Sequence, residues 1–254
     1  MVSAGNVSIS SSSSNPRSVS DPNPHSDTDP RFYGRRKGKP LKAARQGLLE
    51  SLLPHVRIER PEGPLDPTTL FAFKPTALRL EIGFGSGEHL AAQAGENPNT
   101  GFIGSEVFLN GVASLLRYVG AANLANVRVF DADVRLLLPN LPDAAFERIS
   151  LLFPDPWPKT RHAKRRFVSP EMLDECARLL ADGGELRVAS DHPVYQRWTL
   201  QHAAVHTNFQ WATKGPEDWR TRPVDSVATR YEGKAIAAGR KPAFFTFVRR
   251  NRAA

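Results

Sequence analysis

The sequence predicts an α/β fold in which a mostly parallel sheet carries helices on both faces. First, short apolar runs of strand length alternate with segments whose apolar residues follow the period of a helix. Second, strands that are separated by helices pair in parallel, with the helices packed against both faces. Third, the pattern changes after residue 205, where two apolar runs predict an antiparallel closing pair.

The expected elements follow in order along the chain. Strands are expected at residues 78–84, 101–107, 126–133, 148–153 and 184–190, with the closing pair at 208–214 and 243–250. Helices are expected at residues 46–58, where Pro54 would end the helix, and then at 87–96, 109–123 and 169–184. The last helix has the clearest boundaries, since Ser169 can cap it, Pro170 suits its first turn and Gly183 can stop it.

The charge and the cysteine content limit the class of protein. Lys and Arg number 34 against 26 Asp and Glu, a net charge of +8. This balance favours polyanionic partners, with nucleic acid as the first candidate and an acidic membrane surface as the second. The sequence shows neither an apolar run of membrane-helix length nor the hydrophobic core of a secretory signal. The single cysteine, Cys176, lies on the apolar face of its helix and excludes an internal disulfide. We therefore expect a cytoplasmic protein without a membrane anchor or a metal site.

Composition divides the chain into three parts. Residues 1–30 are rich in Ser and Pro and almost free of large apolar side chains, which predicts a disordered tail. Residues 31–60 are expected to form a basic arm and a short helix, and Phe32 and Tyr33 offer stacking surfaces for bases. Residues 61–254 contain all the expected strands and are predicted to form the main domain.

The stretch LEIGFGSGEHL places Gly83, Gly85 and Gly87 in the turn between the first strand and the next helix. Glycines there let the backbone approach a ligand, beside the free amides of a helix N-terminus. The later glycine of a dinucleotide fingerprint is missing, and Glu81 stands before the first glycine. A carboxylate there would repel a pyrophosphate but suits a ligand with an ammonium group and no phosphate, such as S-adenosylmethionine. The alternative is a tight turn without a ligand.

Acidic residues also end the next two expected strands. Glu106 follows the second strand, where a carboxylate can accept hydrogen bonds from both hydroxyls of a ribose. Asp133 ends the third strand and would face an adenine amino group, although Asp131 is an open alternative. Each acid alone is typical of a solvated loop, but three of them above one glycine turn favour a nucleoside ligand.

The stretch SLLFPDPWPKTRHAKRRFVSP places Asp155 directly after the fourth strand, beside the reactive end of a ligand held by the first three. Pro154 and Pro156 restrict the backbone of this loop, and Trp157 either packs beneath it or stacks on a base. The basic residues that follow at once favour a clamp for phosphates over an ordinary surface charge run: Lys159, Arg161, Lys164, Arg165 and Arg166.

These stretches resemble the bacterial tRNA (guanine-N7)-methyltransferase family. The resemblance rests on LEIGFGSGEHL, GSEVF, LLFPDPWPKTRHAKRRFVSP, ELRVASDHPVY and TRYEGKA, and it covers roughly residues 78–247. It implies a Rossmann-like class I methyltransferase domain over residues 61–254, with a mostly parallel seven-stranded sheet and an antiparallel closing strand. It also implies methyl transfer from S-adenosylmethionine to N7 of a guanosine in the tRNA variable loop (position 46), with S-adenosylhomocysteine as the product.

The resemblance implies a role for each matching residue. Asp155 would be the catalytic residue. Cofactor contacts would come from Glu81, Gly83, Gly85, Gly87, Glu106, Asp133 and Asp155. Substrate contacts would come from Lys159, Asp191, Thr229, Arg230, Tyr231 and Glu232, and RNA contacts from Arg161, His162, Lys164, Arg165 and Arg166. The implied partner is tRNA, and we expect a monomer without an obligatory protein partner.

Guanine N7 carries a lone pair and no proton, so methyl transfer to it depends on alignment more than on a base. Asp155, assisted by Asp191, would either orient the guanine or stabilise the charge that develops on the ring. The closest alternative is an exocyclic-amine RNA methyltransferase, which the Asp of P-D-P-W disfavours. An RNA-binding protein with an inactive methyltransferase fold is disfavoured by the intact set of glycines and acids, and a nicotinamide oxidoreductase by Glu81.

Overall fold

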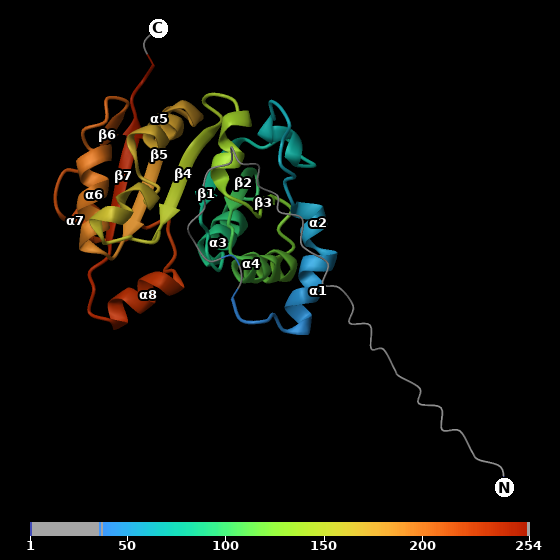
Figure 1. The fold of residues 1–254 in the computed structure, drawn as a ribbon. Helices are drawn as coiled ribbons and strands as arrows, with labels where there is room; N and C mark the ends of the chain where they lie inside the picture. Colours follow the sequence, from blue (N-terminus) through green and yellow to red (C-terminus); the bar gives the residue numbers. More distant parts are fainter. Residues whose placement is uncertain (2–35, 37, 253–254) are drawn as a thin grey trace.

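One seven-stranded sheet organises the part of the chain that the structure describes. The structure is a computed structural model, which describes Met1, Arg36 and residues 38–252. Its strands are β1 (Ala77–Ile82), β2 (Thr100–Ser105), β3 (Val127–Phe130), β4 (Phe146–Leu152), β5 (Leu180–Ser190), β6 (Phe209–Trp211) and β7 (Ala243–Arg249). Their order is β3-β2-β1-β4-β5-β7-β6, and β7 runs antiparallel to both of its neighbours whereas the other pairs are parallel (Figure 1). The predicted sheet and its antiparallel closing pair are confirmed.

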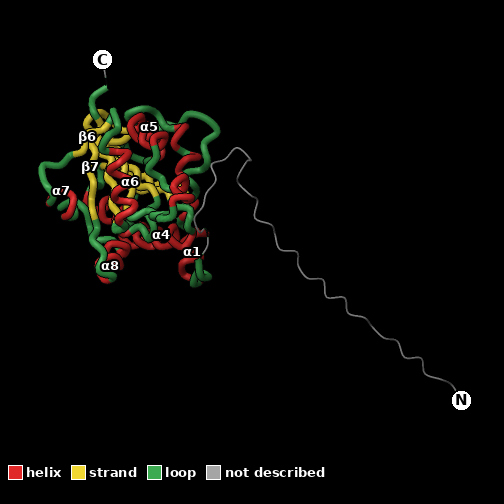
Figure 2. Tube along the Cα trace, turned by 60° about the vertical axis from the view of Figure 1, so that its left-hand side comes forward, coloured by secondary structure: helices red, strands yellow, loops and turns green. Residues whose placement is uncertain are grey.

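Helices cover both faces of this sheet. They are α1 (Ala43–Ser51), α2 (Leu53–Val56), α3 (Glu88–Glu96), α4 (Leu109–Ala122), α5 (Pro170–Leu179), α6 (Pro193–Ala203), α7 (Glu217–Arg220) and α8 (Arg230–Ala237). Neighbouring residues of β2 point into different apolar clusters. Phe102 packs with residues of α3 and α4, and Ile103 belongs to the cluster that includes residues of α5 and α6. In Figure 2, α6 lies in front of the strands of the sheet.

The register of the strands brings the loops that follow them together. Ile82 at the end of β1 pairs with Ser105 on β2 and with Leu151 on β4, and Ser105 pairs with Phe130 on β3. Strands β1 to β4 therefore end at one edge of the sheet. This is the edge at which open parallel sheets bind ligands.

Two predicted helix boundaries are wrong. Pro54 does not end the first helix but lies in the first turn of α2, where its missing N–H costs no helical hydrogen bond. Gly183 does not stop α5, because the helix ends at Leu179 and Leu180 is already extended as the first residue of β5. Pairing between β4 and β5 thus takes over residues that local signals assign to the helix.

The predicted cap, first turn and buried cysteine of α5 are confirmed. Ser169 accepts a hydrogen bond from the Met172 amide at 3.3 Å, and Pro170 is the first residue of the helix. Cys176 is 2% exposed in the core, and burial raises the pKa of its thiol to about 12.

Residues 2–30 of the predicted tail 1–30 and the aromatic pair Phe32 and Tyr33 lie outside the described residues. The described part of the basic arm is joined to the start of α4. The Leu109 amide donates to the Arg36 carbonyl at 3.0 Å, and the Gly38 amide donates to the Asn110 side chain at 2.9 Å. Among the described residues, no helix is both long and apolar enough to cross a membrane.

Candidate active site

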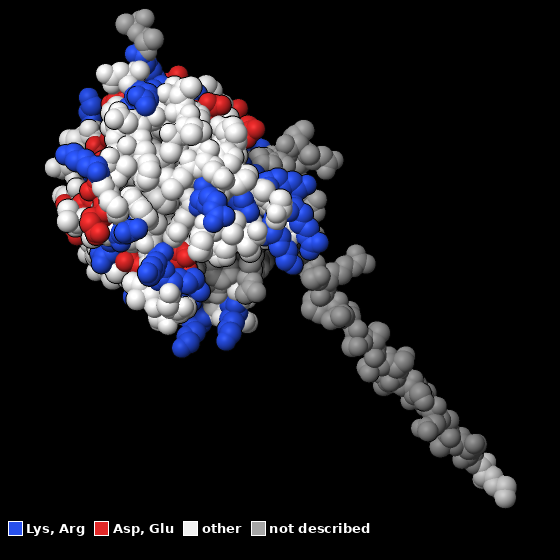
Figure 3. Space-filling view, turned by 90° about the vertical axis from the view of Figure 1, so that its left-hand side faces the viewer, with Lys and Arg blue, Asp and Glu red and all other residues white. Residues whose placement is uncertain are grey.

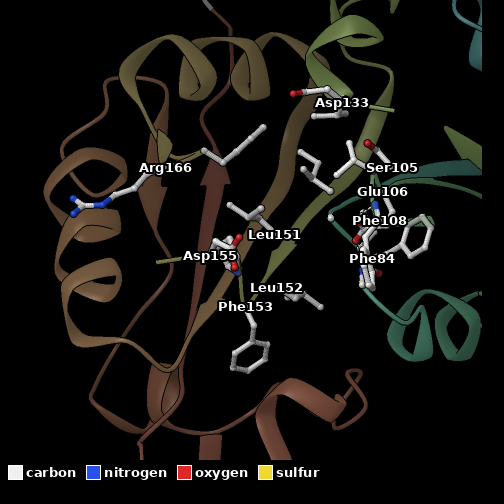
Figure 4. Close-up of a pocket in the computed structure, with 18 of the residues that line it drawn as sticks. Phe84, Ser105, Glu106, Phe108, Asp133, Leu151, Leu152, Phe153, Asp155 and Arg166 are labelled. Carbon is white, nitrogen blue, oxygen red and sulfur yellow. Dashed lines mark hydrogen bonds between the residues drawn. The ribbon is translucent and has the colours of Figure 1, made fainter. Parts of the chain in front are cut away.

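A cavity of about 700 Å³, here called the pocket, opens at the carboxyl edge of β1 to β4 (Figure 4). This volume lies in the range of small-molecule sites. Of the predicted site residues, the pocket is lined by Glu81, Gly83, Gly85, Glu106, Asp133, Asp155, Lys164, Arg165, Arg166, Thr229 and Tyr231. Residues outside its lining are Gly87, Lys159, Arg161, His162, Asp191, Arg230 and Glu232.

The glycine loop after β1 passes close to the start of α4. Gly85 and Gly87 have φ angles of 59° and 80°, in the left-handed region that glycine adopts at little cost. A Cβ at Gly111 of α4 would lie 2.2 Å from the carbonyl oxygen of Gly85, so the glycines let the two segments meet. A Cβ at Gly85 itself would lie 2.9 Å from the ring of Tyr231, which covers this part of the loop.

Glu81 lies in the pocket wall with a histidine that the sequence reasoning missed. Glu81 is 5% exposed, and its Oε2 lies 2.7 Å from Nδ1 of His89. His89 comes from the first turn of α3, so its place directly after the glycines was the available signal. The imidazole holds one carboxylate oxygen, which fixes the orientation of the group toward the pocket.

Glu106 joins the end of β2 to the glycine loop. Its Oε2 accepts a hydrogen bond from the Gly85 amide at 2.7 Å, and its Oε1 accepts one from the Phe108 amide at 2.9 Å. Burial raises the pKa of Glu106, and the amide hydrogen bonds lower it by a smaller amount. The nearby charge of Asp155 also raises this pKa. The carboxylate is therefore a buried group whose charge the loop amides partly stabilise.

The structure separates the two aspartates that were open alternatives after β3. Asp131 accepts two hydrogen bonds at 2.8 Å from Arg57 and does not line the pocket. Asp133 is 6% exposed, lines the pocket and accepts hydrogen bonds from the Arg135 guanidinium at 3.0 and 2.6 Å. Of these two aspartates, Asp133 is therefore the one that lines the pocket.

The loop that carries Asp155 has an unusual backbone. Phe153 and Trp157, on either side of Asp155, have φ angles of 52° and 40°. The left-handed region costs a non-glycine residue about 1–2 kcal/mol, so contacts must hold this loop in shape. One such contact is the hydrogen bond from the Phe153 amide to the Ala189 carbonyl at 2.8 Å. Asp155 itself is exposed and faces the pocket across from Glu106 (Figure 4).

A second support for this loop is Arg166. Its Nη2 donates to the Trp157 carbonyl at 2.9 Å and its Nε to the Pro156 carbonyl at 3.3 Å. The guanidinium also stacks on Trp198 of α6 at 4.4 Å and extends away from the pocket (Figure 4). Arg166 is 7% exposed. The expected RNA contact from Arg166 does not fit this placement, because the charge is already enclosed by the protein.

Trp157 forms part of the pocket wall. Its ring lies 4.9 Å from the guanidinium carbon of Arg165 and 5.9 Å from the imidazole of His162, both in the 3-10 turn Thr160–Arg165. The indole is half-buried, so it packs against the basic segment on one side and faces the pocket on another. Of the two interpretations of Trp157, packing is the one that these contacts support.

Comparison with known proteins identifies the family. A sequence profile described as "Putative methyltransferase" matches residues 75–244. A tRNA (guanine-N(7)-)-methyltransferase from Rhodospirillum rubrum is 56% identical over 89% of this chain and 90% of its own length. One from Paramagnetospirillum magneticum is 53% identical over 88% of this chain and 94% of its own. The chain belongs to the tRNA (guanine-N7)-methyltransferase family.

In this methyltransferase the sheet order and helix layers are those of the Rossmann-like class I fold that the motifs implied. Among solved structures, the 16S rRNA methyltransferase KamB is similar at 16% identity and a TM-score of 0.49, over 70% of this chain and 89% of that chain. Within the described residues, no group of three or more His, Cys, Asp or Glu side chains could hold a metal ion.

The TRYE residues of this methyltransferase divide between the pocket and the interior. Thr229 caps α8 by accepting a hydrogen bond from the Glu232 amide at 3.1 Å, and it lines the pocket together with Tyr231. Glu232 is 6% exposed and pairs with Arg222 at 3.2 Å. Arg230 is exposed outside the pocket.

The remaining residues expected to contact substrate or RNA are Asp191 and the basic residues after Asp155, and of those described next only Lys164 lines the pocket. Asp191, at the end of β5, forms an ion pair with Arg240. Lys159, Arg161 and Lys164 are exposed along the segment after the Asp155 loop. The structure therefore gathers the expected cofactor residues other than Gly87 around the pocket and leaves Lys159 and Arg161 exposed outside it.

Proposed function

We propose that this methyltransferase transfers the methyl group of S-adenosylmethionine to N7 of a guanosine in the variable loop of a tRNA in the cytoplasm. The observation that carries the proposal is the position of Asp155. It stands at the mouth of an acidic pocket and at the start of an exposed basic segment. A small cationic cofactor in the pocket and a polyanionic substrate on the basic segment could therefore meet beside the Asp155 carboxylate.

The pocket residues fit the cofactor. S-adenosylmethionine carries a sulfonium and an ammonium, and the buried carboxylates of Glu81, Glu106 and Asp133 line the cavity. Glu81, oriented by His89, would hold the ammonium, Glu106 the ribose hydroxyls and Asp133 the adenine amine. Apolar side chains of β4, of the segment after β3 and of α5 also line the cavity and suit an adenine ring: Leu151, Leu152, Ala132, Val134 and Met172. When bound, the cofactor supplies an electrophilic methyl group.

Asp155 would act on the guanine. Because N7 has no proton to lose, the residue need not be a base, and its exposed carboxylate can accept hydrogen bonds from the N1–H and the exocyclic amine. Such contacts would hold the ring in line with the methyl group, and alignment accounts for much of the catalysis in two-substrate reactions. The same charge would favour the cationic ring that methylation produces.

The surface beside Asp155 suits an RNA backbone. Lys159, Arg161 and Lys164 are exposed next to the loop. In Figure 3, Lys and Arg side chains gather along the lower part of the face, at the height of α8 in Figure 1. Exposed basic residues in and after α8 include Arg230, Lys234 and Lys241. Phosphate contacts of this kind would orient the tRNA, while the pocket selects the base.

The test is methyl transfer from labelled S-adenosylmethionine to unmodified tRNA, followed by nucleoside analysis. We expect 7-methylguanosine, a product that disappears with Asp155→Ala and persists with the surface control Asp143→Ala. A tRNA with 7-deazaguanosine at the target position has no N7 and should accept no methyl group. A methyl group on an exocyclic amine, or transfer to the deaza substrate, would contradict the proposal.

A further inference from the structure

A layer of arginines lies on the face of β1, β4 and β5, next to the segment that leads into α8. Arg79 on β1 pairs in register with Arg148 on β4, and Arg187 follows two residues after Glu185 on β5. The side chains of these arginines are only 14–17% exposed. Burial lowers the pKa of Arg148, and the charges of Arg187 and Arg79 lower it further. The layer therefore needs acidic partners.

Asp225 supplies one of these partners from outside the sheet. Its Oδ1 lies 2.7 Å from Nη1 of Arg187, and its Oδ2 lies 3.1 Å from Nη2 of Arg148. Its backbone carbonyl accepts a hydrogen bond from the Gln93 side chain of α3 at 2.5 Å. Two strands and a helix thus hold a single residue of the connecting segment.

Asp225 stands a short way before the residues that reach the pocket. Arg222 connects the two sides of the segment that contains Asp225. It donates to the Ser226 carbonyl at 2.8 Å and pairs with Glu232 of α8 at 3.2 Å. Thr229 and Tyr231 follow four and six residues after Asp225 and line the pocket. The ring of Tyr231 lies against Gly85 although the residue is 44% exposed. The protein therefore encloses Tyr231 only in part.

We propose that Asp225 is a positioning residue, which holds Thr229 and Tyr231 in the pocket wall through its contacts with Arg148 and Arg187. It touches neither the pocket nor a reacting atom and acts through the backbone between it and α8. Removal of its charge leaves two largely buried guanidinium groups with less counter-charge, and the segment loses its tie to the sheet. As a statement about methyl transfer, this inference rests on the proposed function.

The test compares Asp225→Asn with a matched control, Asp143→Asn. Asp143 also pairs with an arginine, Arg178 at 2.8 Å, but it precedes β4 at the opposite edge of the sheet. Trypsin can cut after Arg230 only when the start of α8 opens. We expect Asp225→Asn to speed the release of the fragment that begins at Tyr231 by about tenfold and to weaken S-adenosylhomocysteine binding by at least about fivefold, in line with the cost of small misplacements. Asp143→Asn should change neither the rate of cleavage at Arg230 nor the affinity for S-adenosylhomocysteine.

A double variant separates positioning from general loss of stability. If Asp225 acts by placing Tyr231, Asp225→Asn should add little to the loss of cofactor affinity that Tyr231→Ala causes alone. Full additivity, wild-type cleavage at Arg230, or equal effects of Asp143→Asn would overturn the proposal. These binding and cleavage measurements need no tRNA. They decide the role of Asp225 even if the wild-type protein fails to methylate N7, which would refute only the proposed function.

Discussion

The carboxylate of Glu106 and the amide of Gly85 are joined by a hydrogen bond of 2.7 Å, which connects the end of β2 to the glycine loop after β1. The same carboxylate accepts from Phe108 at the start of α4. Glu106 therefore shapes the wall of the pocket before it meets any ligand. A residue that was predicted for a ribose contact is also a structural support of the glycine loop.

Glu106→Gln should weaken S-adenosylhomocysteine binding by about tenfold or more, because charged hydrogen bonds of this kind contribute about 1.5–3 kcal/mol. The glutamine also turns an N–H group toward a backbone amide that needs an acceptor. Isothermal titration calorimetry would measure the affinity. Glu96→Gln, at the exposed end of α3, is the control and should bind as the wild type does.

The pH dependence of binding should report the same residue. Burial raises the pKa of Glu106, so this group takes up a proton at a higher pH than an ordinary glutamate. A raised pKa means that the neutral form is favoured in the fold, so the charge needed for binding is lost early on acidification. As the pH is lowered, cofactor affinity should therefore begin to fall at a pH above 4.5, the ordinary pKa of a glutamate. Glu106→Gln should flatten this part of the pH profile. An unchanged profile in the variant would assign the fall to another group.

Gly85→Ala should damage the pocket by two separable effects. Gly85 has a φ of 59°, which costs an alanine about 1–2 kcal/mol, and its new Cβ would lie 2.9 Å from Tyr231. Gly239→Ala is the matched control, since Gly239 has a φ of 70° but open space around its Cβ. Thermal unfolding should show similar destabilisation for both variants, whereas only Gly85→Ala should lose cofactor affinity. Equal binding by the two variants would argue against contact between Tyr231 and the loop.

Arg166→Lys should destabilise the fold by about 2 kcal/mol, because a lysine cannot donate to two carbonyls and stack on Trp198 at once. Urea unfolding would measure the change. Arg161→Lys, at an exposed position, should leave the stability as it is. If the Arg166 variant kept wild-type stability but lost RNA affinity, its assignment as a support of the Asp155 loop would be wrong.

Neutralising the exposed basic segment should weaken RNA binding. Lys159→Gln, Arg161→Gln and Lys164→Gln should each weaken tRNA binding and reduce the slope of its salt dependence by about 1 if the residue contacts a phosphate. Binding would be titrated at several salt concentrations. Lys74→Gln removes an exposed charge before β1, at the other edge of the sheet, and should leave the slope unchanged. An unchanged slope in the variant that combines Lys159→Gln, Arg161→Gln and Lys164→Gln would show that this segment is not part of the RNA interface.

Local chemistry explains what could be predicted from the sequence. The glycine loop, Glu106, Asp133 and Asp155 each follow an apolar run, and parallel strands necessarily bring such positions to one edge. The choice between Asp131 and Asp133 could not be made in this way. It depends on Arg57, which is distant in sequence and pairs with Asp131.

Contacts between distant residues explain what could not be predicted. Arg166 is one basic residue among several, and only its neighbours in the fold show that Trp198 and two loop carbonyls enclose it. The role of Asp225 likewise depends on arginines of β4 and β5. The end of α5 was misjudged for the same reason, since Leu180 pairs with Phe146 across the sheet.

The position of β7 between β5 and β6 has a consequence for synthesis of the protein. The ribosome makes β6 before β7, yet among the described strands β6 pairs with the sheet only through β7. Until β7 emerges, the nascent chain exposes the edge of β5, and an open edge is a template for pairing with other chains. The α8 segment is also made in this interval, so one wall of the pocket is completed only near the end of translation. A polypeptide released before β7 would keep the glycine loop and Asp155 but could not close the sheet beside them.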